Sequence, residues 1–174
     1  KRKVISIDPT AGIDFFPIEK KIRYIPSVKD INKVISFAAP DVRDYLWVIR
    51  DTMARVDEIN RLTWDDVFFE GKGGHVVLYT RKKRGGNLTP RKIPMTKRLY
   101  EILARRFASR DVAFPWVFCN VYVDWKSKET KIGPYRYRKT LLNTLCTKAK
   151  VRRFGYHALR HSGASIMASQ NVPI

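Results

Sequence analysis

The hydrophobic period of the sequence changes twice along the chain, and this change constrains the fold more than any other feature. Between residues 27 and 62 the apolar residues follow the three- and four-residue spacing of helices, as Ile31 and Val34 do. Residues 67–95 instead contain short apolar runs separated by glycine-rich turns, which is typical of strands joined in hairpins. The helical spacing returns after Thr96. This order predicts an α+β fold, in which a mostly helical domain contains a small three-stranded antiparallel sheet.

Capping residues give approximate bounds for these elements. Ser27, with Asp30 three residues later, has the pattern of a helix N-terminus, and Asp41 and Thr96 are expected to cap two further helices. Other helices are expected from Val56 to near Thr63 and Trp64, and at residues 135–148 and 158–168, the last beginning just after His157. Strands are expected at residues 67–69, 75–80 and 91–95. Residues 1–26 are rich in turn formers and are expected to be a linker or arm, so that residues 27–174 form one domain.

Positive charge is concentrated in the second part of the chain. The 174 residues carry a net charge of +19, of which residues 1–80 contribute +1 and residues 81–174 contribute +18. A folded domain with this distribution is expected to have a strongly positive face that attracts phosphate polyanions. The alternative is a basic surface without a partner, although +19 far exceeds what solubility requires of one domain.

Composition excludes several other classes of protein. With 44% hydrophobic residues the chain is too apolar for a disordered polycation, yet it has no run of about 18 apolar residues that could span a membrane. The N-terminal residues do not form a secretory signal. Cys119 and Cys146 suit a reducing compartment and provide neither a disulfide framework nor the spacing of zinc ligands.

The segment from His157 to His161 contains residues that suit a phosphodiester. His157 and Arg160 are three residues apart, so they share one face of a helix. An arginine offers a planar fork that matches two phosphate oxygens, and a histidine can donate a hydrogen bond or move a proton near neutral pH. By itself this spacing also arises by chance on basic helices.

A second segment places Arg55 at the start of a short helix and Glu58 one turn later. A backbone bend before this helix could direct Arg55 into a cleft, where Glu58 would hold a cation in place. The alternative is a surface ion pair between these two residues, worth a few tenths of a kcal/mol.

A third segment, Arg81–Arg84, lies at the tip of the expected hairpin. A lysine there is well placed to enter DNA and protonate a leaving oxygen. The alternative is a charged loop whose residues contact backbone phosphates.

In this order and spacing, the three segments resemble the catalytic domain of tyrosine site-specific recombinases, the phage integrase family. The run from Ala54 to Ile59, followed by Leu62–Val67, is similar to the family's first arginine box. Arg91–Met95 is similar to the strand after its lysine hairpin, and His157–His161 to its second box. The resemblance covers roughly residues 27–170.

The resemblance implies a role for each matching residue. Arg55 and Arg160 are expected to clamp the scissile phosphate and to stabilise the charge of its pentacoordinate transition state. Lys82 would be the general acid that protonates the departing 5′ oxygen, with Lys83 in reserve because the hairpin register is fixed only to within one residue. His157 would assist proton transfer and orient the phosphate.

Other matching residues are expected to support the site or to hold DNA. Glu58 corresponds to a supporting acidic position, and His161 is expected to pack or donate locally. Contacts to double-stranded DNA are expected from Arg81, Arg84 and Arg91. Neither a metal nor a cofactor is expected, because the arginines take the place of a cation.

The family's reaction joins the 3′ phosphate of DNA to a tyrosine and frees a 5′ hydroxyl. In the family that tyrosine follows the second arginine by a few dozen residues, whereas this sequence ends 14 residues after Arg160 and none of its eight tyrosines matches the position. Residues 27–174 are therefore expected to be a catalytic domain that lacks its C-terminal segment, monomeric and inactive in cleavage. Residues 1–26 would be the arm from a missing N-terminal DNA-binding domain.

The full-length protein is then expected to be a bacterial or phage-encoded enzyme of DNA recombination and integration. It would act in the cytoplasm, without a membrane, as a tetramer on the recombining DNA. Two alternatives remain: a non-catalytic DNA-binding module of the same fold, and an unrelated basic nucleic-acid-binding protein. The last would leave the ordered set of Arg55, Lys82, His157 and Arg160 to chance.

Overall fold

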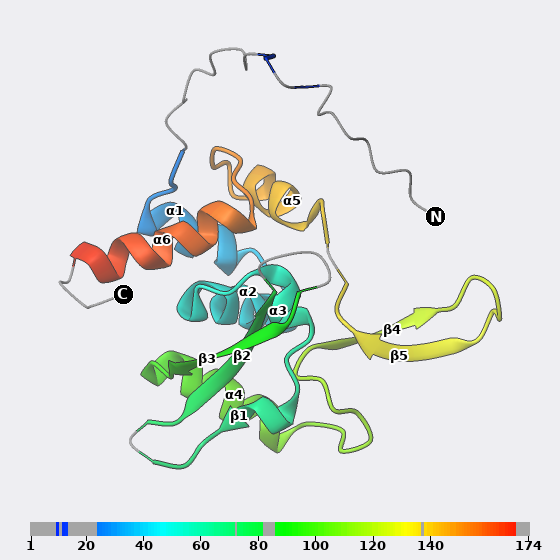
Figure 1. Ribbon diagram of the computed structural model, residues 1–174. Coiled ribbons are helices and arrows are strands. Elements are labelled where there is room, and N and C mark those ends of the chain that lie inside the picture. The colour runs from blue at the N-terminus through cyan, green and yellow to red at the C-terminus, as the bar shows by residue number, and fades with distance from the viewer. Residues whose placement is uncertain are drawn as a thin grey trace.

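The computed structural model describes residues 24–71, 73–81, 86–136 and 138–169, together with residues 10, 12 and 13 (Figure 1). This part of the chain forms a helical body with one three-stranded sheet and a separate two-stranded hairpin, which confirms the predicted α+β class. The helices are α1 (Val28–Ser36), α2 (Pro40–Thr52), α3 (Val56–Asn60), α4 (Lys97–Ala108), α5 (Leu141–Lys148) and α6 (Tyr156–Ser169). The strands are β1 (Val67–Phe68), β2 (His75–Arg81), β3 (Leu88–Pro94), β4 (Cys119–Val123) and β5 (Thr130–Pro134).

Helix α2 is the centre of the domain. It packs against α1, α3, α4 and α6, and four of its apolar side chains are fully buried: Tyr45, Leu46, Val48 and Ile49. A helix that is covered on so many sides contributes to the core around most of its circumference, which fixes the positions of its neighbours relative to one another. The rings of Phe118 and Tyr135 lie edge-on to that of Tyr45, with centroids 5.2 and 5.1 Å away.

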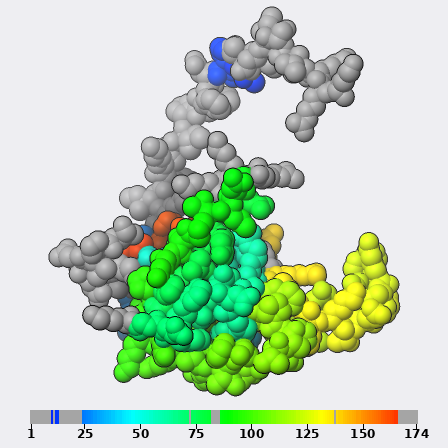
Figure 2. All heavy atoms as spheres, turned by 60° about the horizontal axis from the view of Figure 1, so that its bottom comes forward, coloured from blue at the N-terminus to red at the C-terminus, as the bar shows by residue number. Residues whose placement is uncertain are grey.

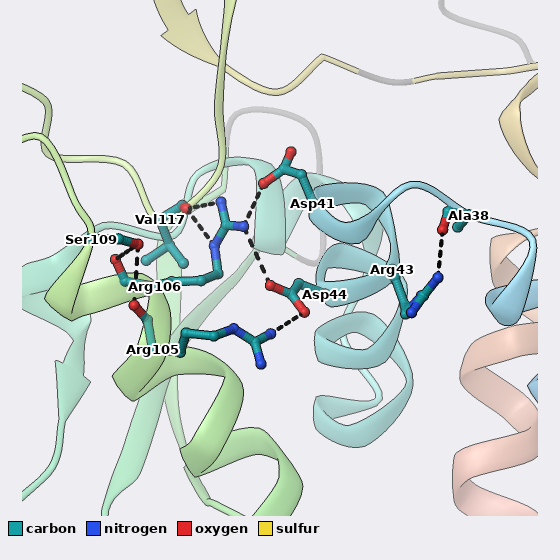
Figure 3. Close-up of polar contacts among 8 residues, drawn as sticks. All are labelled: Ala38, Asp41, Arg43, Asp44, Arg105, Arg106, Ser109 and Val117. Carbon is teal, nitrogen blue, oxygen red and sulfur yellow. Dashed lines mark hydrogen bonds and ion pairs between the residues drawn. The ribbon is translucent and has the colours of Figure 1, made fainter.

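Ion pairs join α2 to α4 (Figure 3). Arg105 donates to the Asp44 carboxylate at 2.6 Å, and Arg106 pairs with Asp41 and donates to the carbonyl of Val117 at 3.0 Å. At the other end of α2, the two carboxylate oxygens of Asp51 accept hydrogen bonds from Arg98 at 2.7 and 2.6 Å. Three arginines of the basic half of the sequence thus neutralise aspartates of α2, so their charge is not available to an external polyanion.

The three-stranded sheet has the order β1–β2–β3, with both pairs antiparallel. Val76 and Leu78 on β2 face the core and are buried, while Tyr79 between Leu78 and Thr80 is exposed. Because side chains alternate along a strand, Thr80 lies on the same face of the sheet as Val76 and Leu78. Arg91 on β3 pairs with Leu78, so its side chain lies on that face too. This alternation directs one hydroxyl and one guanidinium toward α3.

The structure corrects three predicted helix boundaries. Tyr135 does not begin a helix: its N–H donates to the Phe118 carbonyl at 3.0 Å and its ring enters the core, so α5 starts only at Leu141. Asp41 is not a cap, since Ala39 holds that position and Pro40 opens α2. Helix α6 begins at Tyr156 and not after His157, because the amides of Ala158 and Leu159 already donate to Gly155.

The caps expected at Ser27 and Thr96 are confirmed. Each hydroxyl accepts a hydrogen bond from the amide three residues later, at Asp30 and Leu99. Strand β3 is longer at its start than the predicted 91–95. No helix in the described part of the chain is long and apolar enough to cross a membrane. Most of the predicted linker, residues 1–26, lies outside the described residues.

Gly163 allows α6 to cross closely over the end of α2. A Cβ atom at this position would lie 2.7 Å from the carbonyl oxygen of Arg50 and 3.0 Å from Cγ of Met53. We expect Gly163→Ala to lower the free energy of unfolding by about 1–3 kcal/mol, because the backbone of α2 cannot move without disturbing the core. Urea unfolding measures this change. Ser165→Ala, on the exposed side of α6, is the control, with an expected change below about 0.5 kcal/mol; a Gly163→Ala protein as stable as the control would contradict the close crossing.

Candidate functional site

A left-handed residue between α2 and α3 positions Arg55. Met53 ends α2 with φ of 50°, a conformation that is uncommon for residues other than glycine. The chain then reverses, with the amide of Ala54 donating back to the carbonyl of Ile49 at 3.3 Å. Arg55 becomes the N-cap residue of α3 and its side chain is exposed. The structure thereby confirms the bend expected before this helix.

Glu58 is the buried centre of the site, with only 5% of its surface exposed. Its carboxylate accepts hydrogen bonds from the Arg55 amide at 3.0 Å, the Thr80 hydroxyl at 2.8 Å and the Arg91 guanidinium at 2.7 Å. Burial opposes ionisation of Glu58, but these three donors and the charge of Arg91 outweigh it and lower its pKa. A single ionised carboxylate therefore ties α3 to β2 and β3.

Arg55 also contacts the end of β2. Its Nη1 donates to the carbonyl oxygen of Arg81 at 3.3 Å, which is the last residue of the strand. The surface ion pair between Arg55 and Glu58, considered as an alternative above, is not what joins these residues. Glu58 binds the backbone amide of Arg55, so the Arg55 guanidinium can reach a ligand.

The start of α6 faces the same place. Arg55 and neighbouring α3 residues line one side of a cleft of about 370 Å³, and Gly155, His157 and Arg160 line the other. His157 lies in the first turn of α6, where the helix dipole favours a bound anion, and Arg160 lies one turn later. Residues from two segments about 100 positions apart in the sequence therefore meet in one cleft.

Two guanidiniums, of Arg55 and Arg160, and one carboxylate, of Asp57, line the cleft. Burial lowers the pKa of Arg160; nearby Glu58 raises it, while Arg91 and Arg55 lower it further. Arg160 stays protonated at any working pH, because the guanidinium of an arginine is not deprotonated in proteins. Arg160 thus lies near the Glu58 carboxylate and near the guanidiniums of Arg55 and Arg91, and an anion bound beside Arg55 and Arg160 would reduce the repulsion between them.

The structure places the other predicted site residues as follows. Arg81 is exposed at the end of β2, whereas Lys82, Lys83 and Arg84 lie outside the described residues. Arg91, predicted to contact DNA, is bound to Glu58. His161 is not part of the Arg55 cleft and instead lines a separate cavity of about 420 Å³ next to His157.

Thr80 and the pairing of Arg91 with Glu58 are not predicted from the sequence. The alternation of side chains along the strands could have indicated both, because it places Thr80 and Arg91 on the inward-facing side of the sheet, together with Val76 and Leu78. To predict that Arg91 lies beside Thr80, however, one must know the register of β2 against β3, which the sequence does not define. Chemically, the arrangement can bind a phosphate between two guanidiniums and offer it a histidine proton. Among the described residues, no group of three or more acidic, histidine or cysteine side chains could hold a metal ion.

Residues 27–174 match the phage integrase family, and the chain therefore belongs to it. Solved tyrosine recombinases share its fold. The integrase of the Tn1549 transposon, in complex with circular intermediate DNA, is 18% identical with a TM-score of 0.64, over 89% of this chain and 57% of that chain. The XerA recombinase is 18% identical with a TM-score of 0.63, over 87% and 53%.

The XerH site-specific recombinase bound to its difH substrate is also 18% identical, with a TM-score of 0.60, over 88% of this chain and 45% of that chain. This chain thus spans about half the length of these structures. No curated protein sequence matches this chain.

The Glu58 contacts predict a characteristic pH dependence of stability. Because its pKa is lower in the folded chain, the stabilisation is complete above the ordinary glutamate pKa of about 4.3 and is lost as the pH falls through the folded value. We expect Glu58→Gln to reduce the free energy of unfolding by about 1–3 kcal/mol at pH 7, through the loss of charge-assisted hydrogen bonds.

The difference between the two proteins should shrink as the pH falls below about 4.3, measured by urea unfolding from pH 7 to pH 3. Glu101→Gln is the matched control, since Glu101 is exposed on α4 and lies 4.0 Å from Lys97. A Glu58→Gln effect that stays constant over the whole pH range would contradict an ionised, stabilising Glu58.

Proposed function

We propose that this chain is the DNA-binding catalytic domain of a site-specific tyrosine recombinase, which cleaves and rejoins DNA strands in the full-length protein. The observation that carries the proposal is the cleft in which Arg55, His157 and Arg160 meet. A phosphodiester between two fixed guanidiniums is held in position, and the charge that develops on its oxygens during attack is stabilised. The fold of the chain and its family membership support this reaction over other uses of a positive cleft.

In the proposed reaction, a tyrosine hydroxyl gives up its proton, a transfer that His157 assists, and its oxygen attacks the phosphorus to form a 3′-phosphotyrosyl bond. The bond from phosphorus to the 5′ oxygen breaks, and that oxygen takes a proton from Lys82, or from Lys83 in its place. The described part of β2 supports this assignment, because the strand ends at Arg81 with its carbonyl bound to Arg55, one residue before Lys82. His157, at the start of α6, would orient the phosphate and assist proton transfer.

None of the described tyrosines is proposed as the nucleophile. The Tyr45 hydroxyl donates to Asn60 in the core at 2.6 Å. Tyr156 contributes to the lining of the cleft, but its side chain is buried and its hydroxyl donates to the carbonyl of Arg138 at 3.3 Å. We propose that the tyrosine belongs to a further segment of the full-length protein, that residues 1–174 do not cleave DNA by themselves, and that the full-length protein assembles as a tetramer on DNA in the bacterial cytoplasm.

Double-stranded DNA is the proposed substrate. The Tn1549 integrase and the XerH recombinase, which share this fold, were solved in complexes with DNA. The net charge of +19 and the positive cleft give this chain the electrostatics for a phosphate polyanion.

The first prediction of this proposal concerns binding. The chain should bind duplex DNA with an affinity that falls steeply with salt, because each neutralised phosphate contributes about −0.9 to the slope of log affinity against log salt concentration. Fluorescence anisotropy with a labelled duplex between 50 and 200 mM salt measures this slope. A flat dependence would contradict DNA binding through the positive face.

The second prediction concerns cleavage by the full-length protein. Arg160→Ala should slow formation of the covalent adduct with a nicked suicide substrate by at least about 100-fold, because one transition-state donor is lost. Arg160→Lys is the matched variant: it keeps the charge and most of the DNA affinity, but loses the two-pronged contact, and should also be slow. Normal adduct formation by Arg160→Ala would contradict the phosphate clamp, and a full-length protein that binds DNA without forming any adduct would favour a non-catalytic module.

A further inference from the structure

The hairpin of β4 and β5 projects from the body of the domain (Figures 1 and 2). Its five-residue strands pair with each other from Cys119 opposite Pro134 to Val123 opposite Thr130. Neither strand makes comparable contact with another helix or strand among the described elements. This hairpin is not predicted from the sequence, and the proposed cleavage site does not include it.

One face of the hairpin is apolar and uncovered. Val121 and Val123 are 61% and 63% exposed, and Ile132, which pairs with Val121, is also exposed. A two-stranded ribbon is at best marginally stable in water, and its free edges invite further contacts. An apolar ribbon that stands away from its own core is therefore a candidate contact surface.

The tip of the hairpin is an ordered turn that presents an aromatic ring and two cations. The Asp124 carboxylate accepts hydrogen bonds from the amides of Lys126 and Ser127 at 2.9 and 3.4 Å. Lys128 has φ of 59°, and its amide donates to the Asp124 carbonyl at 2.8 Å. Trp125 is 75% exposed on this turn. The ammonium group of Lys126 lies over its ring, 5.7 Å from the centroid.

The charges of the hairpin favour a polyanion as its partner. Residues 119–139 contain six basic and two acidic side chains. Both acidic groups, Asp124 and Glu129, lie within 4 Å of the ammonium group of Lys131. Lys126 and Lys128 form no ion pair with any residue that the structure describes, so the tip itself is positive. At the base, the guanidinium of Arg136 stacks on the ring of Tyr122 at 4.5 Å.

A second copy of this chain is a poorer partner for the hairpin. Each copy carries a net charge of +19, so docking of a basic tip on another copy would be opposed by like-charge repulsion. Duplex DNA complements the tip, and its major groove admits a two-stranded ribbon. Apolar side chains in a groove contact thymine methyl groups and sugars, which accounts for an uncovered apolar face next to lysines.

We propose that the β4–β5 hairpin is a second DNA-binding element, which enters a groove of the duplex with Trp125, Lys126 and Lys128 at its tip. This inference rests on the proposed function of the chain as a DNA-binding recombinase domain. A five-residue strand is about 17 Å long, so the tip reaches roughly half a helical turn of DNA from the base of the hairpin. The hairpin would then extend the footprint of the domain beyond the phosphate in the cleft.

Binding of a labelled 30-base-pair duplex to the chain, measured by anisotropy over a series of salt concentrations, tests the proposal. The double variant Lys126→Ala with Lys128→Ala should reduce the magnitude of the salt slope by about 1–2, because about 0.9 is lost with each phosphate contact. Trp125→Ala should lower the affinity roughly 5- to 10-fold, as expected for the loss of one anchoring aromatic side chain, with little change in the slope. All three residues are exposed, so the thermal unfolding midpoint should not change.

The matched control is Lys29→Ala with Lys33→Ala, which removes the same charge from exposed positions on α1 and should change the slope by less than half as much. Tip variants that keep the parent affinity and slope would overturn the proposal, while salt-dependent binding by the parent chain would leave the proposed function intact. The proposal would also be overturned if Val121→Ser with Val123→Ser abolished self-association in sedimentation and left duplex affinity unchanged, because the partner of the apolar face would then be a second copy.

Discussion

The buried carboxylate of Glu58 is the interaction on which the rest of the site depends. It binds the amide that begins α3, the hydroxyl at the end of β2 and the guanidinium of Arg91 on β3. A carboxylate with 5% exposure remains charged only because three donors satisfy it. In return, its negative charge makes it favourable for Arg160 and Arg91 to lie close together, since two guanidiniums without a nearby anion would repel each other. The cleft is therefore held ready for a further anion before any ligand binds.

The positive charge of the chain has three distinct uses in this structure. Arg98, Arg105 and Arg106 stabilise the packing of α4 on α2 through its aspartates. Arg91 binds Glu58 and Arg160 lies near it, Arg55 and Arg160 line the cleft, and we infer that the lysines at the hairpin tip face DNA. The concentration of basic residues after position 80 alone could not separate these groups, because an ion pair between α2 and α4 joins residues about 50 to 60 positions apart.

The sequence predicted the elements whose signals are local. The helices capped by Ser27 and Thr96, and the sheet between residues 67 and 95, follow from caps, periodicity and turns, and the structure confirms them. The prediction failed where tertiary contacts override local preference. Tyr135 has a helical pattern after it, but its ring is drawn into the core beside Tyr45. The β4–β5 hairpin was missed because a polar six-residue turn without glycine separates its short strands. For the site, the bend before Arg55 could be predicted, whereas the partners of Glu58 depend on the β2–β3 register.

The central claim is that Arg55 and Arg160 act on one phosphate, and a double-mutant cycle in the full-length protein tests it most directly. The measurement is the single-turnover rate of covalent adduct formation for Arg55→Ala, Arg160→Ala and the double variant, each at saturating protein. If the two arginines hold one phosphate, the rate of adduct formation should fall at least about 100-fold in each single variant. It should fall little further in the double variant, because removal of either guanidinium already prevents the phosphate from being held in place. Losses that simply multiply in the double variant would show that the two arginines act independently, and would contradict the clamp.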